Sequence, residues 1–293
     1  MLFSIIVPTF NNYELLKKTI KSVENQTSKN YELIIVDNNS ADKTDEVIKN
    51  CNIENLIYKK INNQGIIAKS RNLGAKVSNG DWLIFLDSDD TISKDKIAFL
   101  TNNINDKYDL VCNAERLIDI DLDKIKIKTY GPFEENFYKK MLLNGNKFST
   151  SASVIKKSFL LEKKIRFQEK QNFVTAEDYD FFLHIINAKA KVKFFKNILG
   201  DHFYYQGSQS SNYKLHKNSV REVLKHHIFD IQNFEEDKNK LWESIQWRLI
   251  LMDFFKEKKE KNYVKSALLF FKILLNSPFK LLSFIVINLK NKF

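Results

Sequence analysis

The chain has 293 residues, a formal net charge of +11 and 43% hydrophobic residues, but only 7 glycines and 3 prolines. The apolar content is sufficient for a packed core, so a folded chain is expected rather than a disordered one, and the small number of turn residues argues against an all-β fold. The charge comes mainly from dispersed lysines, which fit either a solvated surface or attraction to anionic ligands and lipid headgroups, and the sequence contains no signature of nucleic-acid binding.

Short β-branched runs alternate with amphipathic segments in the first hundred residues. We expect strands at residues 3–8, 31–37, 55–60 and 82–87, and helices at residues 13–23, 45–50 and 66–77. This alternation predicts a parallel sheet covered by helices.

Strand and helix patterns continue to about residue 215, where helices alone follow. DLVCNA and VKFFKN predict strands, residues 176–188 predict a helix, and a charged stretch at 235–240 separates the first two C-terminal helices. The predicted fold class is therefore α/β, with a mainly parallel, Rossmann-like central sheet flanked by helices and a C-terminal helical extension. We predict one domain over residues 1–215, made of the halves 1–90 and 91–215, and a helical region over 216–293.

The last thirty residues contain apolar blocks interrupted by Lys272, Pro278 and Lys280. Neither block reaches the roughly 20 residues that a membrane-spanning helix needs. Short amphipathic helices with basic flanks suit the membrane interface, and the alternative is that they pack on the domain. We favour the interface because apolar residues nearly encircle the final segment.

The cysteines and the N-terminal residues indicate the cellular compartment in which the protein is expected. Cys51 and Cys112 have no CxxC spacing and no matching histidine cluster, so we interpret them as reduced thiols. The first residues enter a predicted strand directly, without the features of a secretory leader. The expected location is the cytoplasm.

Polar and acidic side chains follow three of the predicted strands. Thr9 and Asn11 follow the first strand, Asp37 ends the second, and the DSDD cluster at residues 87–90 follows the fourth. Ligands of such sheets bind outside the carboxyl ends of the strands, so these clusters predict one site at that edge.

The DSDD cluster concentrates carboxylates that would repel one another without a cation between them. Mg²⁺ or Mn²⁺ prefers such oxygen ligands and keeps coordination positions free for phosphate oxygens. The alternative is an acidic loop that caps a helix beginning near Ser93.

Four motifs follow one another along the chain: SIIVPTFNN, LIIVDNNS, SRNLGAKVSNGDWLIFLDSDD and AEDYDF. In this order they resemble the family 2 glycosyltransferases of the GT-A fold, over roughly the first two hundred residues. The resemblance implies an inverting, metal-dependent enzyme with Mn²⁺ or Mg²⁺ as cofactor. It would move a hexosyl or N-acetylhexosaminyl group from a nucleotide-diphosphate sugar, by family analogy a UDP-sugar, to a glycan or lipid-linked acceptor in surface polysaccharide or lipooligosaccharide synthesis.

The resemblance also implies roles for individual residues. Residues 1–90 would bind the nucleotide and residues 91–215 the acceptor. Asp89 would bind the metal directly, Asp87 would hold the ribose or a metal-bound water, and Asp90 would cap or support the loop. Residues implied in nucleotide-sugar binding are Pro8, Thr9, Asn11, Asp37, Arg71, Asp87 and Ser88. For Arg71 the alternative is a surface arginine paired with a nearby acid.

Asp178, at the start of the predicted helix, resembles the family's general base, which takes the proton of the acceptor hydroxyl during attack. A single displacement of this kind inverts the anomeric configuration. Glu177 and Asp180 compete for the role, because acidic residues also suit the dipole at a helix start.

The stretch HFYYQGSQSSN departs from the family pattern. Gln206 stands where a basic residue is expected, which weakens the case for a diphosphate clamp in this loop. His202 could reach the metal or a phosphate, and the alternative is a structural histidine.

Three other functions remain open at this point. WLIFLDSDDT also matches the nucleophile motif of haloacid-dehalogenase-like phosphohydrolases, although that motif normally ends the first strand of its domain. A dinucleotide-dependent oxidoreductase would need a glycine-rich turn where PTFNN stands. The non-enzymatic alternative is a membrane-attached binding module with a degenerate site.

The sequence leaves the sugar, the linkage, the acceptor and the oligomeric state open. We expect specificity to depend on the loops between Glu115 and Ser151. The basic amphipathic tail would hold the enzyme peripherally on the inner face of the cell membrane.

Overall fold

The computed structural model describes residues 1–205 and 212–276. It divides into two compact units, each of which is described by itself. The first contains Met1–Met141 and Gly145–Val223, and the second contains Leu142–Asn144 and begins again at Leu224. The predicted domain limit between residues 215 and 216 stays a prediction.

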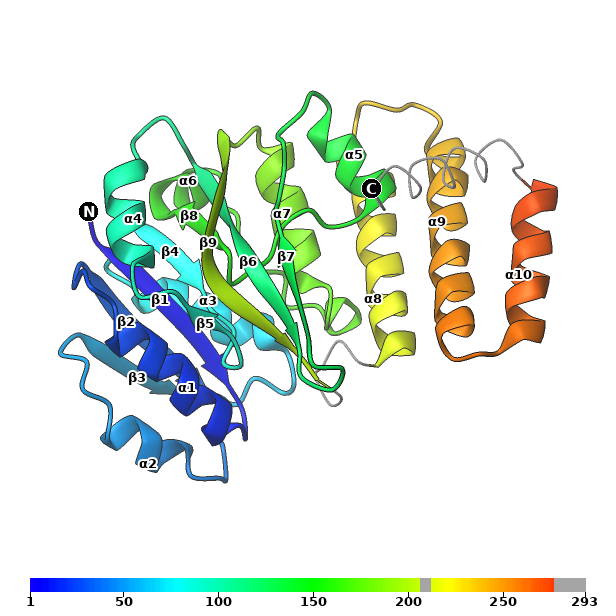
Figure 1. Cartoon of the computed structure of the whole chain (residues 1–293). Helices are drawn as coiled ribbons and strands as arrows, with labels where there is room; N and C mark the ends of the chain where they lie inside the picture. Colours follow the sequence, from blue (N-terminus) through cyan, green and yellow to red (C-terminus); the bar gives the residue numbers. More distant parts are fainter. Residues whose placement is uncertain (206–211, 277–293) are drawn as a thin grey trace. The chain divides into compact units, whose positions relative to one another are not determined.

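The first unit is built on one curled sheet of strands in the order β3-β2-β1-β4-β8-β6-β9-β5, with β7 paired to β6 (Figure 1). The strands are β1 (Phe3–Thr9), β2 (Tyr31–Asp37), β3 (Leu56–Lys60), β4 (Trp82–Phe85), β5 (Thr91–Ile92), β6 (Leu110–Asp119), β7 (Lys124–Lys128), β8 (Ser153–Lys156) and β9 (Val192–Tyr204). Parallel pairing joins β3, β2, β1 and β4, as the sequence predicted for the N-terminal half. Beyond β4 the pairing is mixed, because β8 runs antiparallel to both β4 and β6.

The helices lie between and after these strands. Those before residue 205 are α1 (Tyr13–Glu24), α2 (Thr44–Lys49), α3 (Ile67–Val77), α4 (Lys96–Asn103), α5 (Phe137–Asn144), α6 (Lys157–Glu162) and α7 (Glu177–Asn187), with a short 3-10 helix at Gln171–Phe173. The chain continues with α8 (Tyr213–His226), a π-helical turn at His227–Ile231, α9 (Lys238–Lys259) and α10 (Tyr263–Asn276). The predicted α/β class with a C-terminal series of helices is confirmed.

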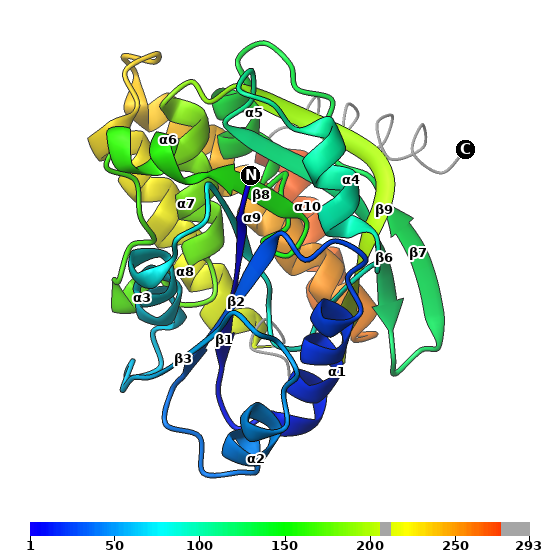
Figure 2. The same cartoon turned by 90° about the vertical axis from the view of Figure 1, so that its left-hand side faces the viewer.

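Strands β1 and β2 are completely buried because helices cover both faces of the sheet. Figure 2 shows the two strands between α1 on one side and α3 on the other. Leu16 and Ile20 of α1 join the core that contains Ile5 of β1. On the opposite face α3 approaches so closely that a Cβ on Gly74 would clash with Ile6. Full burial of each such aliphatic side chain contributes about 1.5–3 kcal/mol to folding.

The segment after β4 differs in detail from the sequence prediction. The strand was expected to reach Asp87, but it ends at Phe85, and the following helix begins at Lys96 and not near Ser93. Between them Thr91 and Ile92 pair with β9, which holds the chain extended at that point. The DSDD cluster is therefore a loop fixed at both ends by strands of the same sheet.

The second unit has its own small core, in which Ile273 of α10 packs against Trp247 and Leu251 of α9. None of the helices in residues 1–205 and 212–276 is long and apolar enough to cross a membrane. The outer face of α10 leaves a row of exposed apolar side chains at helical spacing, Val264, Leu268, Phe271 and Leu275. The predicted amphipathic tail also includes residues 277–293, which lie outside the described residues.

Candidate active site

The DSDD loop combines three partly exposed side chains with one buried carboxylate. Asp87, Ser88 and Asp89 are partly exposed, whereas Asp90 is fully buried. A ligand can therefore reach the first three residues but not the fourth.

Asp90 connects the DSDD loop to residues of other segments. Its carboxylate accepts hydrogen bonds from Ser151 Oγ at 2.6 Å and from the backbone N–H of Phe203 at 3.1 Å, and it lies 2.9 Å from Nδ1 of His202. Despite burial, the hydrogen bond and charge of Asp90 raise the pKa of His202 to about 9, so this histidine is a cation at neutral pH. The predicted contact of His202 with a metal or phosphate stays a prediction; in the structure it is paired with Asp90.

Asp89 carries a negative charge that the protein only partly compensates. Tyr205 donates a hydrogen bond to its Oδ2 at 3.0 Å. Burial, together with repulsion from Asp90 and Asp87, raises the pKa of Asp89 to about 6. A divalent cation would relieve this repulsion, and the oxygen donors of Asp87 and Asp89 are the ligands that Mg²⁺ and Mn²⁺ prefer. The residues present thus fit the predicted metal.

Arg71 connects the DSDD loop to helix α7. It is only 3% exposed, and its Nη2 donates to Asp87 Oδ1 at 2.7 Å while Nη1 donates to Glu177 Oε1 at 2.6 Å. The ring of Phe167 lies beside the guanidinium, 5.2 Å from its centroid to the arginine Cζ. Removing one partner from a buried ion pair of this kind costs about 3–5 kcal/mol. The alternative for Arg71 was a surface arginine paired with a nearby acid. The structure shows the pairing with acids, but Arg71 is buried and does not lie on the surface.

Asp178 lies in the first turn of α7, next to Glu177. Its Oδ2 accepts a hydrogen bond from Asn146 Nδ2 at 3.0 Å, and its side chain is partly exposed. Burial of the carboxyl group and repulsion from Glu177 raise the pKa of Asp178 to about 7. A carboxylate with a pKa near neutrality is suited to taking and releasing a proton.

The two competing acids of this turn are placed differently. Glu177 is buried and bound to Arg71, and Asp180 is fully buried with His184 3.6 Å away. Asp178 is thus the one acid of the three that solvent or a ligand can reach directly.

The predicted nucleotide-binding residues lie together at the ends of β1 and β2. Pro8 and Thr9 pair with Val36 and Asp37 across the two parallel strands. Asp37 is fully buried: its Oδ1 accepts from the Ser40 backbone N–H at 3.0 Å and its Oδ2 accepts from Tyr58 Oη at 2.9 Å.

Asn11 closes this group by joining the two loops. Its backbone N–H donates to Ser40 Oγ at 2.9 Å, and its Oδ1 accepts from the Ala41 N–H at 2.8 Å. Within the described residues, the buried Oγ1 of Thr9 has no hydrogen-bond partner. Direct contacts of these residues with a nucleotide stay predictions.

Sequence reasoning missed the residues that hold the acids in place. Asn146 binds Asp178, Tyr205 binds Asp89, and Ser151 binds Asp90. Ser151 and Asn146 fall within or at the edge of the loops expected to determine specificity, but no periodicity distinguishes them from neighbouring polar residues. Gln206, where the sequence departs from the family pattern, lies outside the described residues.

Comparisons with known proteins identify the family of this chain and its fold. The family model described as "Glycosyl transferase family 2" matches residues 4–165, more than half of the chain and including the DSDD loop. A curated relative, the poly(ribitol-phosphate) β-N-acetylglucosaminyltransferase TarP of Staphylococcus aureus, is 34% identical over 202 residues, which are 64% of this chain and 58% of TarP. The chain therefore spans less than two thirds of that relative's length.

Two solved structures have a similar fold. S. aureus TarS 1–349 in complex with UDP-GlcNAc superposes with a TM-score of 0.64 at 19% identity, covering 94% of this chain and 80% of that one. The mannosyltransferase PcManGT of Pyrobaculum calidifontis, in complex with GDP-Man and Mn²⁺, superposes with a TM-score of 0.61 at 14% identity. The superposition covers 90% of this chain and 74% of the PcManGT chain. At these identities the likeness shows the fold alone, which is the GT-A fold.

Proposed function

This chain belongs to glycosyl transferase family 2, and we propose that it transfers a sugar from a UDP-sugar to a hydroxyl group of a surface-glycan or lipid-linked acceptor with inversion. The family match includes the DSDD loop, so it favours the transferase over the phosphohydrolase and over an oxidoreductase. Sugar transfer as the general activity follows from the family; the donor, the acceptor and the stereochemistry are the proposal.

The observation that carries the proposal is the bridge made by Arg71. Its two ion pairs, to Asp87 and to Glu177, tie the loop after β4 to the first turn of α7. The next residue of that turn is Asp178, and the charge of Asp87 contributes to its raised pKa. The bridge thus brings the predicted donor side and the predicted base to one place, as a displacement reaction requires.

In the proposed reaction Asp178 accepts the proton of the acceptor hydroxyl. The freed oxygen forms a bond to the anomeric carbon while the bond from that carbon to the donor phosphate oxygen breaks, and UDP leaves with the bonding electrons. Asn146 holds the Asp178 carboxylate through Oδ2, which leaves Oδ1 for the proton. Attack opposite the leaving group inverts the anomeric centre.

Asp89 would hold Mn²⁺ or Mg²⁺ directly and Asp87 would hold the ribose or a metal-bound water, with Tyr205 orienting the Asp89 carboxylate. A cation there would neutralise the negative charge that develops on the leaving diphosphate. The Mn²⁺ present in the similar PcManGT structure supports this choice of cofactor. UDP is supported by the TarS complex and a surface polymer acceptor by the name of TarP.

A panel of nucleotide sugars tests the proposed function. The expected result is that one UDP-sugar is hydrolysed in the presence of Mn²⁺ or Mg²⁺ and raises the midpoint of thermal unfolding, because a ligand that binds only the folded state stabilises it. GDP-sugars and simple phosphate esters serve as controls. Phosphate release from the esters, or a response to GDP-sugars alone, would contradict the proposal.

We also propose that α10 attaches the enzyme peripherally to the inner face of the membrane. The exposed row on α10 includes Leu268, 65% exposed, and Phe271, 58% exposed. Insertion of such side chains into the acyl boundary, with lysines near the headgroups, is how interfacial helices bind.

Replacing both Leu268 and Phe271 by Ser should weaken binding to anionic vesicles by at least about tenfold, because each buried apolar side chain contributes about 1.5–3 kcal/mol. Sedimentation with vesicles measures the bound fraction. Leu161→Ser, at an equally exposed leucine of α6, is the matched control. Equal losses in both variants, or unchanged binding after deletion of residues 264–293, would refute membrane attachment by this segment.

A further inference from the structure

A strained residue precedes the helix that carries Asp178. Thr175 has a φ of +76°, in the left-handed region that a β-branched residue adopts only at an energetic cost. Ala176 follows it as the N-cap of α7, and Asp178 lies in the first turn. Glycine adopts this conformation freely, so a threonine at this position indicates that the surrounding structure imposes the conformation.

Neither the side chain of Thr175 nor the start of the helix compensates for this strain. The Oγ1 of Thr175 is buried and, among the residues that the structure describes, has no hydrogen-bond partner. The N-cap residue Ala176 provides no side-chain hydrogen bond to the first turn, as Ser, Thr, Asp or Asn usually does. The start of α7 is therefore not fixed by its own side chains, and contacts from another segment must hold it.

Side chains of α8 bind the strained turn. Nδ1 of His216 lies 2.9 Å from the backbone oxygen of Thr175. Because a carbonyl oxygen only accepts hydrogen bonds, Nδ1 carries the proton in this contact. Ser219 is buried, and its Oγ donates to the backbone oxygen of Val174 at 2.5 Å. His216 and Ser219 are neighbours on one face of α8, so this face holds two successive carbonyls of the turn.

The turn also determines where the base lies. The N–H of Ala176 donates to the carbonyl of Phe173 at 2.8 Å, and Phe173 is anchored in the core. The N–H of Asp180 donates to the carbonyl of Ala176 at 3.2 Å, which closes the first turn of α7. Asp178 lies inside this closed turn. The direction of its carboxylate therefore depends on the position of residues 174–176.

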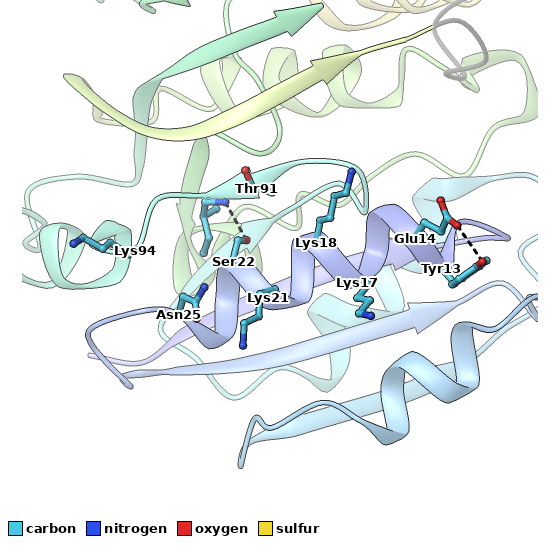
Figure 3. Close-up of a pocket in the computed structure, with 10 residues that line it drawn as sticks. Tyr13, Glu14, Lys17, Lys18, Lys21, Ser22, Asn25, Thr91 and Lys94 are labelled. Atoms are coloured by element: carbon cyan, nitrogen blue, oxygen red, sulfur yellow. Dashed lines mark hydrogen bonds between the residues drawn. The ribbon is translucent and has the colours of Figure 1, made fainter. Parts of the chain in front are cut away.

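The DSDD loop on the other side of the site is held in a comparable way, but without this strain. Thr19 of α1 donates to two backbone oxygens of the loop, and Ser22 of α1 accepts the N–H of Ile92 at 3.2 Å (Figure 3). None of residues 87–92 has a positive φ. Of these two segments, only the turn before the base is forced out of a favoured conformation, which indicates that its position is fixed for function.

We propose that Thr175, His216 and Ser219 are positioning residues, which hold the first turn of α7 so that the Asp178 carboxylate faces the acceptor hydroxyl. This inference rests on the proposed function and adds to it the contacts that place the base. A misplacement of about 1 Å in a catalytic group costs about 100-fold in rate, so a turn that fixes Asp178 benefits the reaction.

Thr175→Gly tests the proposal, because glycine adopts a positive φ without strain. The variant should be at least as stable as the wild type, while kcat falls about 10- to 100-fold and the KM of the donor stays within about twofold. Lys189→Gly is the matched control, because Lys189 is exposed and has a φ of +59° just after the other end of α7. It should also retain full stability and leave kcat unchanged.

A second measurement reports on the turn without using activity. Hydrogen exchange at the Asp180 amide should be at least about tenfold faster in Thr175→Gly and in His216→Ala, because the first turn of α7 opens more often. Lys189→Gly should exchange at Asp180 like the wild type. His216→Asn keeps a side-chain N–H donor and should recover most of the kcat and of the protection that His216→Ala loses.

The proposal is overturned if Thr175→Gly keeps the kcat of the wild type or its exchange rate at Asp180, or if Lys189→Gly loses as much kcat. A lower unfolding midpoint in Thr175→Gly would show that threonine is not strained there and would overturn it as well. If the wild type transfers no sugar, the proposed function fails. The exchange rates at Asp180 then still decide whether α8 holds the turn.

Discussion

Replacement of Asp89 by Asn is expected to lower metal-stimulated donor hydrolysis by about 1,000-fold. The variant removes the carboxylate that Tyr205 orients and that burial, together with repulsion from Asp90 and Asp87, makes costly to ionise. Loss of a cation contact that stabilises the leaving diphosphate by about 4 kcal/mol corresponds to this factor. Release of UDP from the responding donor, measured with Mn²⁺, with Mg²⁺ and with a chelator, gives the effect.

Unfolding measurements on single variants separate the role of Asp89 from that of its neighbour Asp90. Asp90→Asn should lower the free energy of unfolding by about 2–4 kcal/mol, because the buried carboxylate is bonded to Ser151, His202 and Phe203. Asp89→Asn should leave that free energy unchanged or raise it. Asp106→Asn, at an exposed acid paired with Lys156, is the control for loss of a surface carboxylate. A large decrease in the free energy of unfolding of Asp89→Asn, or a rate of donor hydrolysis that the chelator does not change, would contradict the metal assignment.

Asp178→Asn should lower the rate of sugar transfer by about 100- to 10,000-fold while UDP still binds, because an amide cannot accept the acceptor proton. The pKa of Asp178, raised to about 7, sets the pH dependence of the wild type. Only the ionised carboxylate is a base, so the rate should fall as pH decreases below about 7 and level off above it. Initial rates of transfer across this range, with the donor saturating, provide the measurement.

The raised pKa of Asp178 also predicts an effect on stability. A carboxyl group with a higher pKa in the folded state holds its proton more tightly there, so its contribution is favourable at low pH and is lost as pH rises through about 7. Asp178→Asn should therefore raise the midpoint of thermal unfolding at pH 8 and leave it unchanged near pH 4. Glu177→Gln, which breaks the Arg71 ion pair, should instead lower the midpoint. If Glu177→Gln abolished the pH dependence and Asp178→Asn retained transfer, the base would be Glu177.

The sequence predicted the parts of the fold that depend on local pattern. Continuous β-branched runs identified β1 and β2, and the helical spacing of apolar residues identified α1 and α3. The strand that precedes the DSDD loop was found, although its end was placed two residues late. A periodic pattern records which face of an element is buried, but it does not record where a neighbouring strand stops pairing.

The amino-acid sequence by itself determined the alternation of strands and helices in the first hundred residues, the position of acidic residues at the ends of strands, and the family. The family resemblance implied different roles for these acids, but only the tertiary structure showed that Asp90, Glu177 and Asp180 are buried while Asp89 and Asp178 are partly exposed. The physical reason is distance along the chain. Ser151 and His202, which contact the buried Asp90, are 61 and 112 positions away from it. Arg71, which is hydrogen-bonded to Glu177, is 106 positions away from that residue. Adjacent acids share one local context, and their charge, burial and accessibility are set by residues that only the folded sheet brings to them.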